Sequence, residues 1–198
     1  LDSGANADCR PEMLLQFALL GSLYMEHVVC PGETPTVGLL NIGTEDSKGG
    51  ELQKATFPLL RDSGLCFVGN VEARDVPYGK AKVIVADGFS GNVLLKTMEG
   101  TASMLLHTVK ELFMTNLRTK IAGLLVKPYL SGLKKRMDTS EYGGAPVLGV
   151  ARPVIKAHGN SDARAIRSAI RVAAEYAASG AVDRMTEAIA RAAAPTEE

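Results

Sequence analysis

The sequence predicts an α/β protein with a mostly parallel sheet, and three observations support this fold class. Short apolar segments alternate with segments of helical periodicity along the N-terminal half of the chain. The apolar segments end in turns rich in Gly, Asn and Asp, after which a helical pattern begins. Alternation at this spacing is typical of right-handed crossover units, which build parallel sheets. A chain of 198 residues with 46% hydrophobic content can bury the core of one such domain.

The elements expected before residue 100 follow in a regular order. Residues 1–6 read as the end of an interior strand with no preceding element beside it, so we expect the chain to be the C-terminal part of a longer protein. A helix is predicted over 11–28, with Pro11 in the first turn, where its missing N–H costs nothing. The other predicted elements are a strand at 37–42, a helix at 48–62 that Pro58 kinks or shortens, and strands at 66–71 and 83–86.

The pattern changes to long helices after Glu99. A helix is expected over 101–118, and a basic amphipathic segment follows at 119–137. The remaining elements are an apolar segment that begins at Val154, a helix at 162–179 capped by Asn160 or Ser161, and a short helix at 182–193. We therefore expect a single α/β domain over 1–198, with 101–137 as a subregion.

Composition excludes several classes of protein. The 22 basic and 22 acidic side chains give zero formal charge, so nothing global favours nucleic-acid binding. The apolar runs fall short of a membrane span, and no secretory signal is visible. The three cysteines, odd in number and widely spaced, are typical of reduced buried thiols. These features indicate a cytoplasmic protein.

Four turns of similar composition follow the predicted strands, within 1–6, 37–44, 83–92 and 154–162. The carboxyl ends of parallel strands share one edge of a sheet, so we expect these turns to converge on one pocket. The turn at 87–92 precedes a helix whose free N–H groups and dipole favour a phosphate or a developing oxyanion. The alternative is a well-capped connection of the kind found in any α/β protein. The expected binding residues are Asn6, Gly43, Thr44, Asp87, Gly88, Ser90, Gly91, Asn92 and Ser161.

The chemistry available at these turns is polar and non-covalent. The sequence has no Ser-His-Asp or Cys-His arrangement and no metal-ligand cluster, so we expect neither a metal ion nor a cofactor. The candidate catalytic groups are His158, Asn160, Lys156 and Lys96, a set that suits a phosphate held beside an acyl carbonyl. A lone histidine is more often structural, and a lysine one turn inside a helix is ordinarily solvated. Both alternatives stay open.

Six Lys and Arg side chains occur between residues 118 and 136, five of them within the segment 119–137, and no acid occurs between residues 112 and 137. Pro128 interrupts the pattern, so we expect a helical hairpin with an apolar tip near 123–128 rather than one straight helix. One interpretation is adsorption to an anionic membrane surface. The other is a dimer-interface helix pair with a solvated basic face. The residues expected to contact a membrane are Leu124, Leu125, Lys127, Tyr129, Lys134 and Lys135.

Five motifs in fixed order resemble the PlsX family, the bacterial acyl-[acyl-carrier-protein]:phosphate acyltransferases. The similarity covers essentially the whole chain, with one departure at Lys82, where the family pattern has an acidic residue. That position lies outside the turn at 87–92. The motifs are the segments 41–45, 69–75, 87–97, 142–146 and 156–161.

The resemblance implies a three-layer Rossmann-like fold related to isopropylmalate dehydrogenases, with a protruding amphipathic hairpin. It implies a homodimer associated peripherally with an anionic membrane. For the segment 119–137, it therefore favours membrane contact over a role as a dimer-interface helix pair alone. The implied reaction converts acyl-[acyl-carrier-protein] and inorganic phosphate into acyl phosphate, the donor for a downstream glycerol-3-phosphate acyltransferase in phospholipid synthesis. The family has a further Gly- and Asp-bearing N-terminal segment, so this chain is expected to lack part of the site.

Two other functions remain open from the sequence. A phosphotransacetylase-like enzyme would use acyl-CoA as its donor. An inactive membrane-binding scaffold fragment would retain the surface and lack the chemistry.

Overall fold

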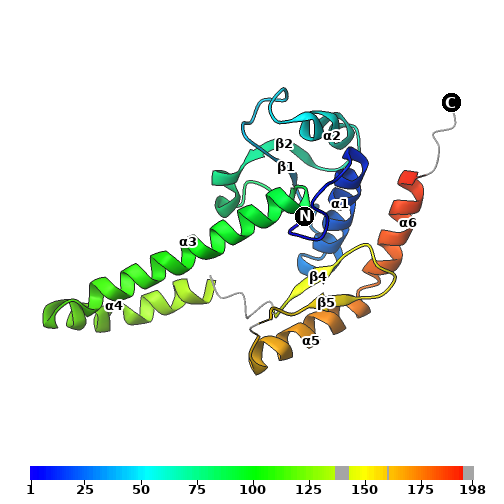
Figure 1. Cartoon of the computed structure of the whole chain (residues 1–198). Coiled ribbons are helices and arrows are strands. Elements are labelled where there is room, and N and C mark those ends of the chain that lie inside the picture. The colour runs from blue at the N-terminus through cyan, green and yellow to red at the C-terminus, as the bar shows by residue number, and fades with distance from the viewer. Residues whose placement is uncertain (137–142, 160, 194–198) are drawn as a thin grey trace.

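The computed structural model describes residues 1–136, 143–159 and 161–193. Its elements are arranged as a body of sheets and helices from which one pair of long helices projects (Figure 1). In chain order they are α1 (Pro11–Tyr24), the π-helix η1 (Met25–Val29), β1 (Val37–Asn41), α2 (Glu51–Arg61), β2 (Phe67–Glu72), the 3₁₀-helix η2 (Ala73–Tyr78), β3 (Val83–Val85), α3 (Gly88–Met114), α4 (Leu117–Arg136), β4 (Ala145–Val147), β5 (Val154–Lys156), α5 (Ala163–Ala178) and α6 (Ala181–Ala193).

The main sheet is parallel, which confirms the predicted fold class in outline. Its strand order is β2-β1-β3, with Leu39 of β1 opposite Val85 of β3 and Asn70 of β2. The first residue extends this sheet, because Leu1 donates to the Ile84 carbonyl and accepts from the Ala86 N–H, the pattern of a parallel pair. The predicted strand end at residues 1–6 is limited to this pairing at Leu1, because residues 3–5 form a bend.

The core of this region lies where α1 and α2 pack on the sheet. Apolar residues from both helices and the strands are almost fully buried, among them Leu14, Val37, Leu39, Leu60 and Val85. Burial of each such side chain stabilises the fold by about 1.5–3 kcal/mol. The predicted helix at 48–62 is shorter, since residues 45–50 form a loop, and Pro58 lies inside α2 without ending it.

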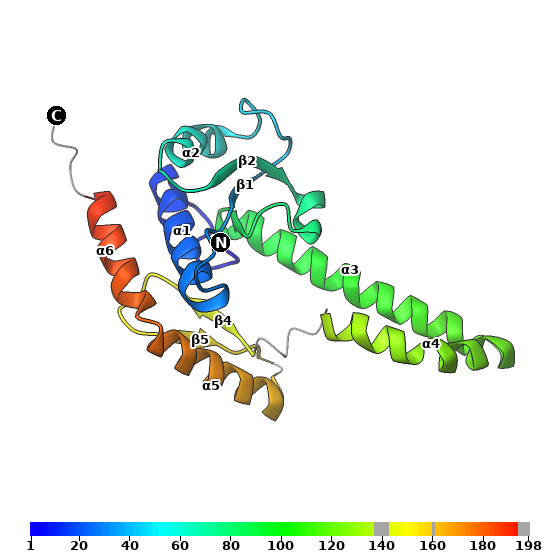
Figure 2. The ribbon, with the colours of Figure 1, turned by 180° about the vertical axis from the view of Figure 1, so that it is seen from behind.

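The segment that begins at Val154 is not part of the parallel sheet, contrary to the prediction that its end would share the sheet edge. β5 pairs antiparallel with β4, with Pro146 opposite Ile155. A parallel partner requires a crossover of a dozen or more residues, whereas the short connection from Val147 to Val154 suits a hairpin. Figure 2 shows this hairpin with α5 and α6 beside α1.

A second apolar cluster joins the hairpin region to the first helix. Leu20 of α1 packs with Tyr176, Ala181 and Met185 of the last two helices. The rings of Tyr24 and Tyr176 meet edge to face, with centroids 5.3 Å apart. The cluster packs α5 and α6 against α1.

The helices α3 and α4 lie side by side and extend away from the rest of the described chain in both ribbon views. The predicted apolar tip near 123–128 is wrong, because α4 runs through Pro128 and the turn lies at Thr115 and Asn116. Asn116 and Thr119 explain this position: the Thr119 N–H donates to Asn116 Oδ1 and the Asn116 N–H donates to Thr119 Oγ1, each at 3.0 Å. This reciprocal pair is a capping box that starts α4.

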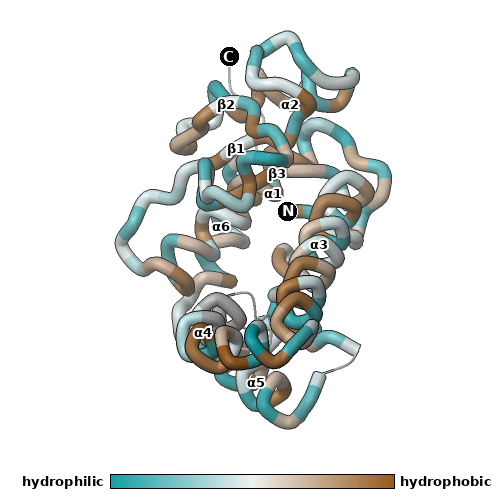
Figure 3. Tube along the Cα trace, turned by 90° about the vertical axis from the view of Figure 1, so that its left-hand side faces the viewer, coloured by the Kyte–Doolittle hydropathy of each residue, from teal (hydrophilic) through white to brown (hydrophobic). Residues whose placement is uncertain are grey.

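Apolar residues recur along both helices of the pair (Figure 3). Gly123 lies close to Phe113, since a Cβ on the glycine would stand 3.0 Å from the Phe113 Cβ. Among residues 1–136, 143–159 and 161–193, no helix combines the length and the apolar character needed to cross a bilayer.

Candidate functional site

The turn at residues 2–6 is organised by one carboxylate. Asp2 accepts from the N–H groups of Gly4 and Ala5, both at 2.9 Å, and from the Asn6 N–H at 2.7 Å. The Asn6 side chain adds a fourth hydrogen bond, from Nδ2 to Asp2 Oδ2 at 2.8 Å. Burial acts to raise the pKa of Asp2, but the hydrogen bonds from Ala5, Asn6 and Gly4 outweigh it and lower the pKa from its ordinary value.

This turn is seated on the first turn of α3. The Gly88 N–H donates to the Asn6 carbonyl at 2.8 Å. A Cβ on Gly88 would lie 2.5 Å from that carbonyl oxygen, and one on Gly91 would overlap the Asp2 carbonyl oxygen. Two glycines are therefore needed for the backbones to approach. The predicted binding residues Asn6, Gly88 and Gly91 are thus brought together, and we call the assembly of residues 2–6 and 87–92 the α3 corner.

The N-terminus of α3 is capped by the side chain of its own N-cap residue, Asp87. Asp87 is buried and accepts from the Ser90 N–H at 2.8 Å, and the Gly91 N–H donates to the Asp87 carbonyl at 2.9 Å. The N–H groups of Gly88 and Ser90 therefore already have acceptors. The polar side chains left at least partly exposed on the α3 corner are those of Ser3, Asn6, Ser90 and Asn92.

The loop after β1 is held by two buried asparagines. Asn41 Nδ2 donates to the Lys48 carbonyl at 3.0 Å, and Asn70 Nδ2 donates to the Glu45 carbonyl at 2.7 Å. Gly43 and Thr44, both predicted binding residues, lie in this loop at the carboxyl end of β1, beside the strand that leads into the α3 corner. Gly43 is buried and Thr44 is exposed, so Thr44 presents the accessible side chain.

Asp2, Asn41 and Asn70 are not among the residues that the sequence predicted for these roles. Asn70 is only 3% exposed, and its Oδ1 has no hydrogen-bond partner among the described residues. The available signal for the two asparagines was an Asn near the end of an otherwise apolar strand pattern. A buried side chain of this kind requires a hydrogen-bond partner, which for both Asn41 and Asn70 is a backbone carbonyl of the loop after β1.

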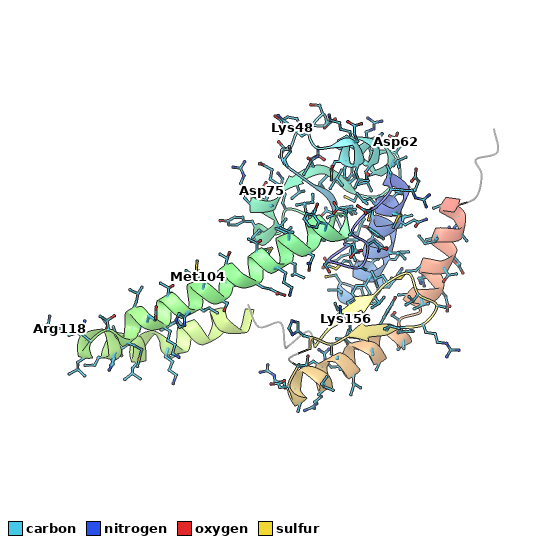
Figure 4. All side chains as sticks on the ribbon, in the orientation of Figure 1. Lys48, Asp62, Asp75, Met104, Arg118 and Lys156 are labelled. Atoms are coloured by element: carbon cyan, nitrogen blue, oxygen red, sulfur yellow. The ribbon has the colours of Figure 1, made fainter. Side chains whose placement is uncertain are left out.

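Lys156 and His158, two of the predicted catalytic residues, lie at and after β5, in a different part of the chain from the α3 corner. Lys156 is the last residue of β5, and the sticks in Figure 4 place it on the β4–β5 hairpin. His158 follows, and its carbonyl accepts from the Ser161 N–H at 3.0 Å. Asn160 lies outside the described residues. The structure thus places Lys156 at the end of β5 and His158 and Ser161 in the segment between β5 and α5, whereas the α3 corner follows β3 of the main sheet.

Lys96 lies within α3 and forms an ion pair with Glu99, with Nζ 2.7 Å from Oε2 and both side chains substantially exposed. This environment is that of a solvated helix lysine, and an exposed pair of this kind contributes little to stability. No group of three His, Cys, Asp or Glu side chains suited to a metal ion occurs in the part of the chain that the structure describes.

The side chains predicted to meet a membrane lie on α4. Leu124, Leu125 and Tyr129 are exposed by 69%, 72% and 82%. Lys127 is also exposed, and Arg118 near the start of the helix is seen at its outer end in Figure 4. Lys134 and Lys135 belong to the last turns of α4, and their side chains lie outside the description. The helix therefore presents apolar and basic groups together.

Comparison with known proteins identifies the family to which this chain belongs. The model of the family described as fatty acid synthesis protein matches residues 1–184. The chain belongs to this family. The match agrees with the resemblance to PlsX acyltransferases, and membership of the PlsX family is confirmed.

Curated relatives of this PlsX-family chain carry the name phosphate acyltransferase. The protein of Oceanobacillus iheyensis is 56% identical over 173 residues, covering 87% of this chain and 52% of the relative. That of Brevibacillus brevis is 54% identical over 89% of this chain and 52% of its own length. That of Anoxybacillus flavithermus is 52% identical over 96% and 57%. The chain spans about half the length of the curated relatives it matches.

Proposed function

We propose that the protein containing this chain is a phosphate acyltransferase that forms acyl phosphate from acyl-[acyl-carrier-protein] and inorganic phosphate. The observation that carries this proposal is the family match over residues 1–184, with relatives named phosphate acyltransferase at 52–56% identity. The product would supply a downstream glycerol-3-phosphate acyltransferase on the route to phosphatidic acid. The whole protein would have a three-layer Rossmann-like fold related to isopropylmalate dehydrogenases.

The reaction needs orientation more than a covalent residue. A phosphate oxygen attacks the thioester carbonyl carbon, the new C–O bond forms, and the C–S bond breaks with its electron pair leaving on sulfur. The thiolate then takes a proton, and the carbonyl oxygen carries negative charge only in the tetrahedral intermediate. Held phosphate and preorganised hydrogen-bond donors are therefore the main requirements.

The exposed side chains of the α3 corner supply donors of the kind that hold phosphate: the amides of Asn6 and Asn92 and the hydroxyl of Ser90. We assign the second set, Lys156, His158, Asn160 and Ser161, to the thioester oxygen and to charge neutralisation. Lys96, already paired with Glu99, is a weaker candidate. In this proposal the two sets act on the same substrate in the whole protein.

The test is acyl-phosphate formation by the full-length protein. Phosphate-dependent thioester cleavage should be faster with acyl carrier protein than with acyl-CoA as donor. His158→Ala, with folding retained, should lower turnover by about 10²-fold, as removal of an oxyanion donor does. Faster turnover with acyl-CoA would favour a phosphotransacetylase-like enzyme, and no product with either donor would favour a scaffold.

We also propose that the protein is a cytoplasmic homodimer that binds an anionic membrane surface through α4. The support is the exposure of Leu124, Leu125 and Tyr129 next to basic residues on a helix that projects from the body. Replacing Leu124 and Leu125 by Glu should reduce sedimentation with anionic vesicles. Ile170→Glu is the matched control, since Ile170 is similarly exposed, by 66%, but lies on α5. Equal binding by all three proteins would refute the membrane role.

A further inference from the structure

We propose that Asp2 is a positioning residue for phosphate binding, acting through Asn6. This inference rests on the proposed function and names the group that sets the geometry of the α3 corner. Asp2 does not touch the substrate in this proposal. Its ionised carboxylate holds the turn at residues 2–6 so that the Asn6 side chain and the first turn of α3 face the same ligand.

The contacts of Asp2 can be made only by a carboxylate. Four N–H bonds converge on its two oxygens, three from the backbone of residues 4–6 and one from Asn6 Nδ2, at 2.7–2.9 Å. An ionised Asp is acceptor-only and offers about four lone-pair sites, whereas Asn replaces one acceptor by a donor. The side chain of Asp2 is buried, so a lost acceptor leaves an N–H of the turn without its partner inside the α3 corner.

The turn held by Asp2 is coupled to α3 at two points. The Asn6 carbonyl accepts a hydrogen bond from the Gly88 N–H at 2.8 Å. The Asp2 carbonyl lies so close to Gly91 that a Cβ does not fit there. A third contact is nearby, because a Cβ on Gly4 would stand 3.4 Å from the Asn92 side chain. A shift of the turn therefore moves Asn6 relative to Asn92.

The Asn6 side chain is oriented by this arrangement. Its Nδ2 is tied to Asp2 Oδ2, which leaves Oδ1 and the second Nδ2 hydrogen on an exposed residue. The second hydrogen is the donor that a phosphate oxygen would accept. The bond from Asn6 Nδ2 to the ionised Asp2 is of the stronger, charge-assisted kind, and it fixes the orientation of the amide.

The experiment measures KM for inorganic phosphate and for the acyl donor in the full-length protein, comparing Asp2→Asn with Asp8→Asn. Asp8 is a nearby exposed carboxylate outside the turn's hydrogen bonds, so its replacement should leave both constants unchanged. Asp2→Asn should raise the phosphate KM at least about tenfold, since small displacements of positioning groups have effects of this size. The KM for the acyl donor should change less than about twofold, which a general loss of folding would not produce.

A double-mutant cycle with Asn6→Ala separates positioning from a purely structural role. If Asp2 acts through the Asn6 side chain, Asp2→Asn should add less than about threefold to the phosphate KM once Asn6 is alanine. Independent, additive effects would overturn the inference. Should Asp2→Asn not fold, Asp2→Glu, which keeps the charge and moves the oxygens, replaces it with the same expectations.

The two proposals fail in different ways. A wild-type protein that makes no acyl phosphate refutes the proposed function. An active wild-type protein whose phosphate KM is unaltered by Asp2→Asn and Asp2→Glu refutes only the role of Asp2.

Discussion

The turns at 87–91 and 158–162 begin in the same way and are built differently. Each leads into a helix whose N-cap is an aspartate: Asp87 accepts from the Ser90 N–H, and Asp162 from the Ala165 N–H, both at 2.8 Å. The first turn is packed against the backbone of residues 2–6. At the second turn, no atom of the described residues lies within 4 Å of the position that a Cβ on Gly159 would take.

Similar local sequences can therefore specify either a rigid corner or an accessible turn. Capping depends on neighbouring residues in the chain, but the cap of α5 is Asp162 and not the predicted Asn160 or Ser161, because the Asp162 carboxylate accepts from the Ala165 N–H. Packing depends on which distant backbone lies alongside, as residues 2–6 do at the α3 corner. We therefore expect substitutions in the first turn to affect stability and those in the second to affect turnover.

Gly91→Ala should produce the largest effect. Its methyl group would overlap the Asp2 carbonyl oxygen, so the turn at residues 2–6 must separate from α3. We expect a loss of about 3 kcal/mol or more in the free energy of unfolding, at the upper end for overpacking. Urea unfolding measures it.

Gly100→Ala is the matched control for that change. Gly100 lies in the same helix with nothing within 4 Å of its Cβ position. Alanine there should stabilise the protein by about 0.5–1 kcal/mol, because it favours the helix. Equal effects of Gly91→Ala and Gly100→Ala would show that the α3 corner is not closely packed.

Replacing the N-cap aspartates of α3 and α5 should change the free energy of unfolding by an intermediate amount. Asp162→Ala should cost about 1 kcal/mol, the usual value for loss of a cap, whereas Asp87→Ala should cost about 2 kcal/mol. The difference arises because Asp87 is buried, at 7% exposure, and the N–H that it leaves unsatisfied is less accessible to water. Thermal unfolding of both variants measures this order, and a larger loss for Asp162→Ala would contradict it.

The sequence predicted the parallel sheet, its helices and the composition of the α3 corner, because these follow from local apolar periodicity and from turn residues. It placed Asn6, Gly88, Gly91 and Asn92 in one site, and the structure brings them together. It did not predict the antiparallel partner of β5, because β4 is only three residues long and contains Pro146, so it has no recognisable strand pattern. Nor did it locate the turn at Asn116, where a capping box outweighs the expected break at Pro128.

Gly159→Ala should give the smallest change in stability and still report on function. The position is open and its φ lies outside the left-handed region, so the free energy of unfolding should change by less than about 0.5 kcal/mol. If the second turn holds the thioester, the added methyl should still displace the substrate and lower turnover about tenfold in the full-length protein. Gly100→Ala should change neither turnover nor packing contacts. Unaltered turnover in Gly159→Ala would remove the second turn from the reaction and leave the α3 corner as the only part of the proposed site carried by this chain.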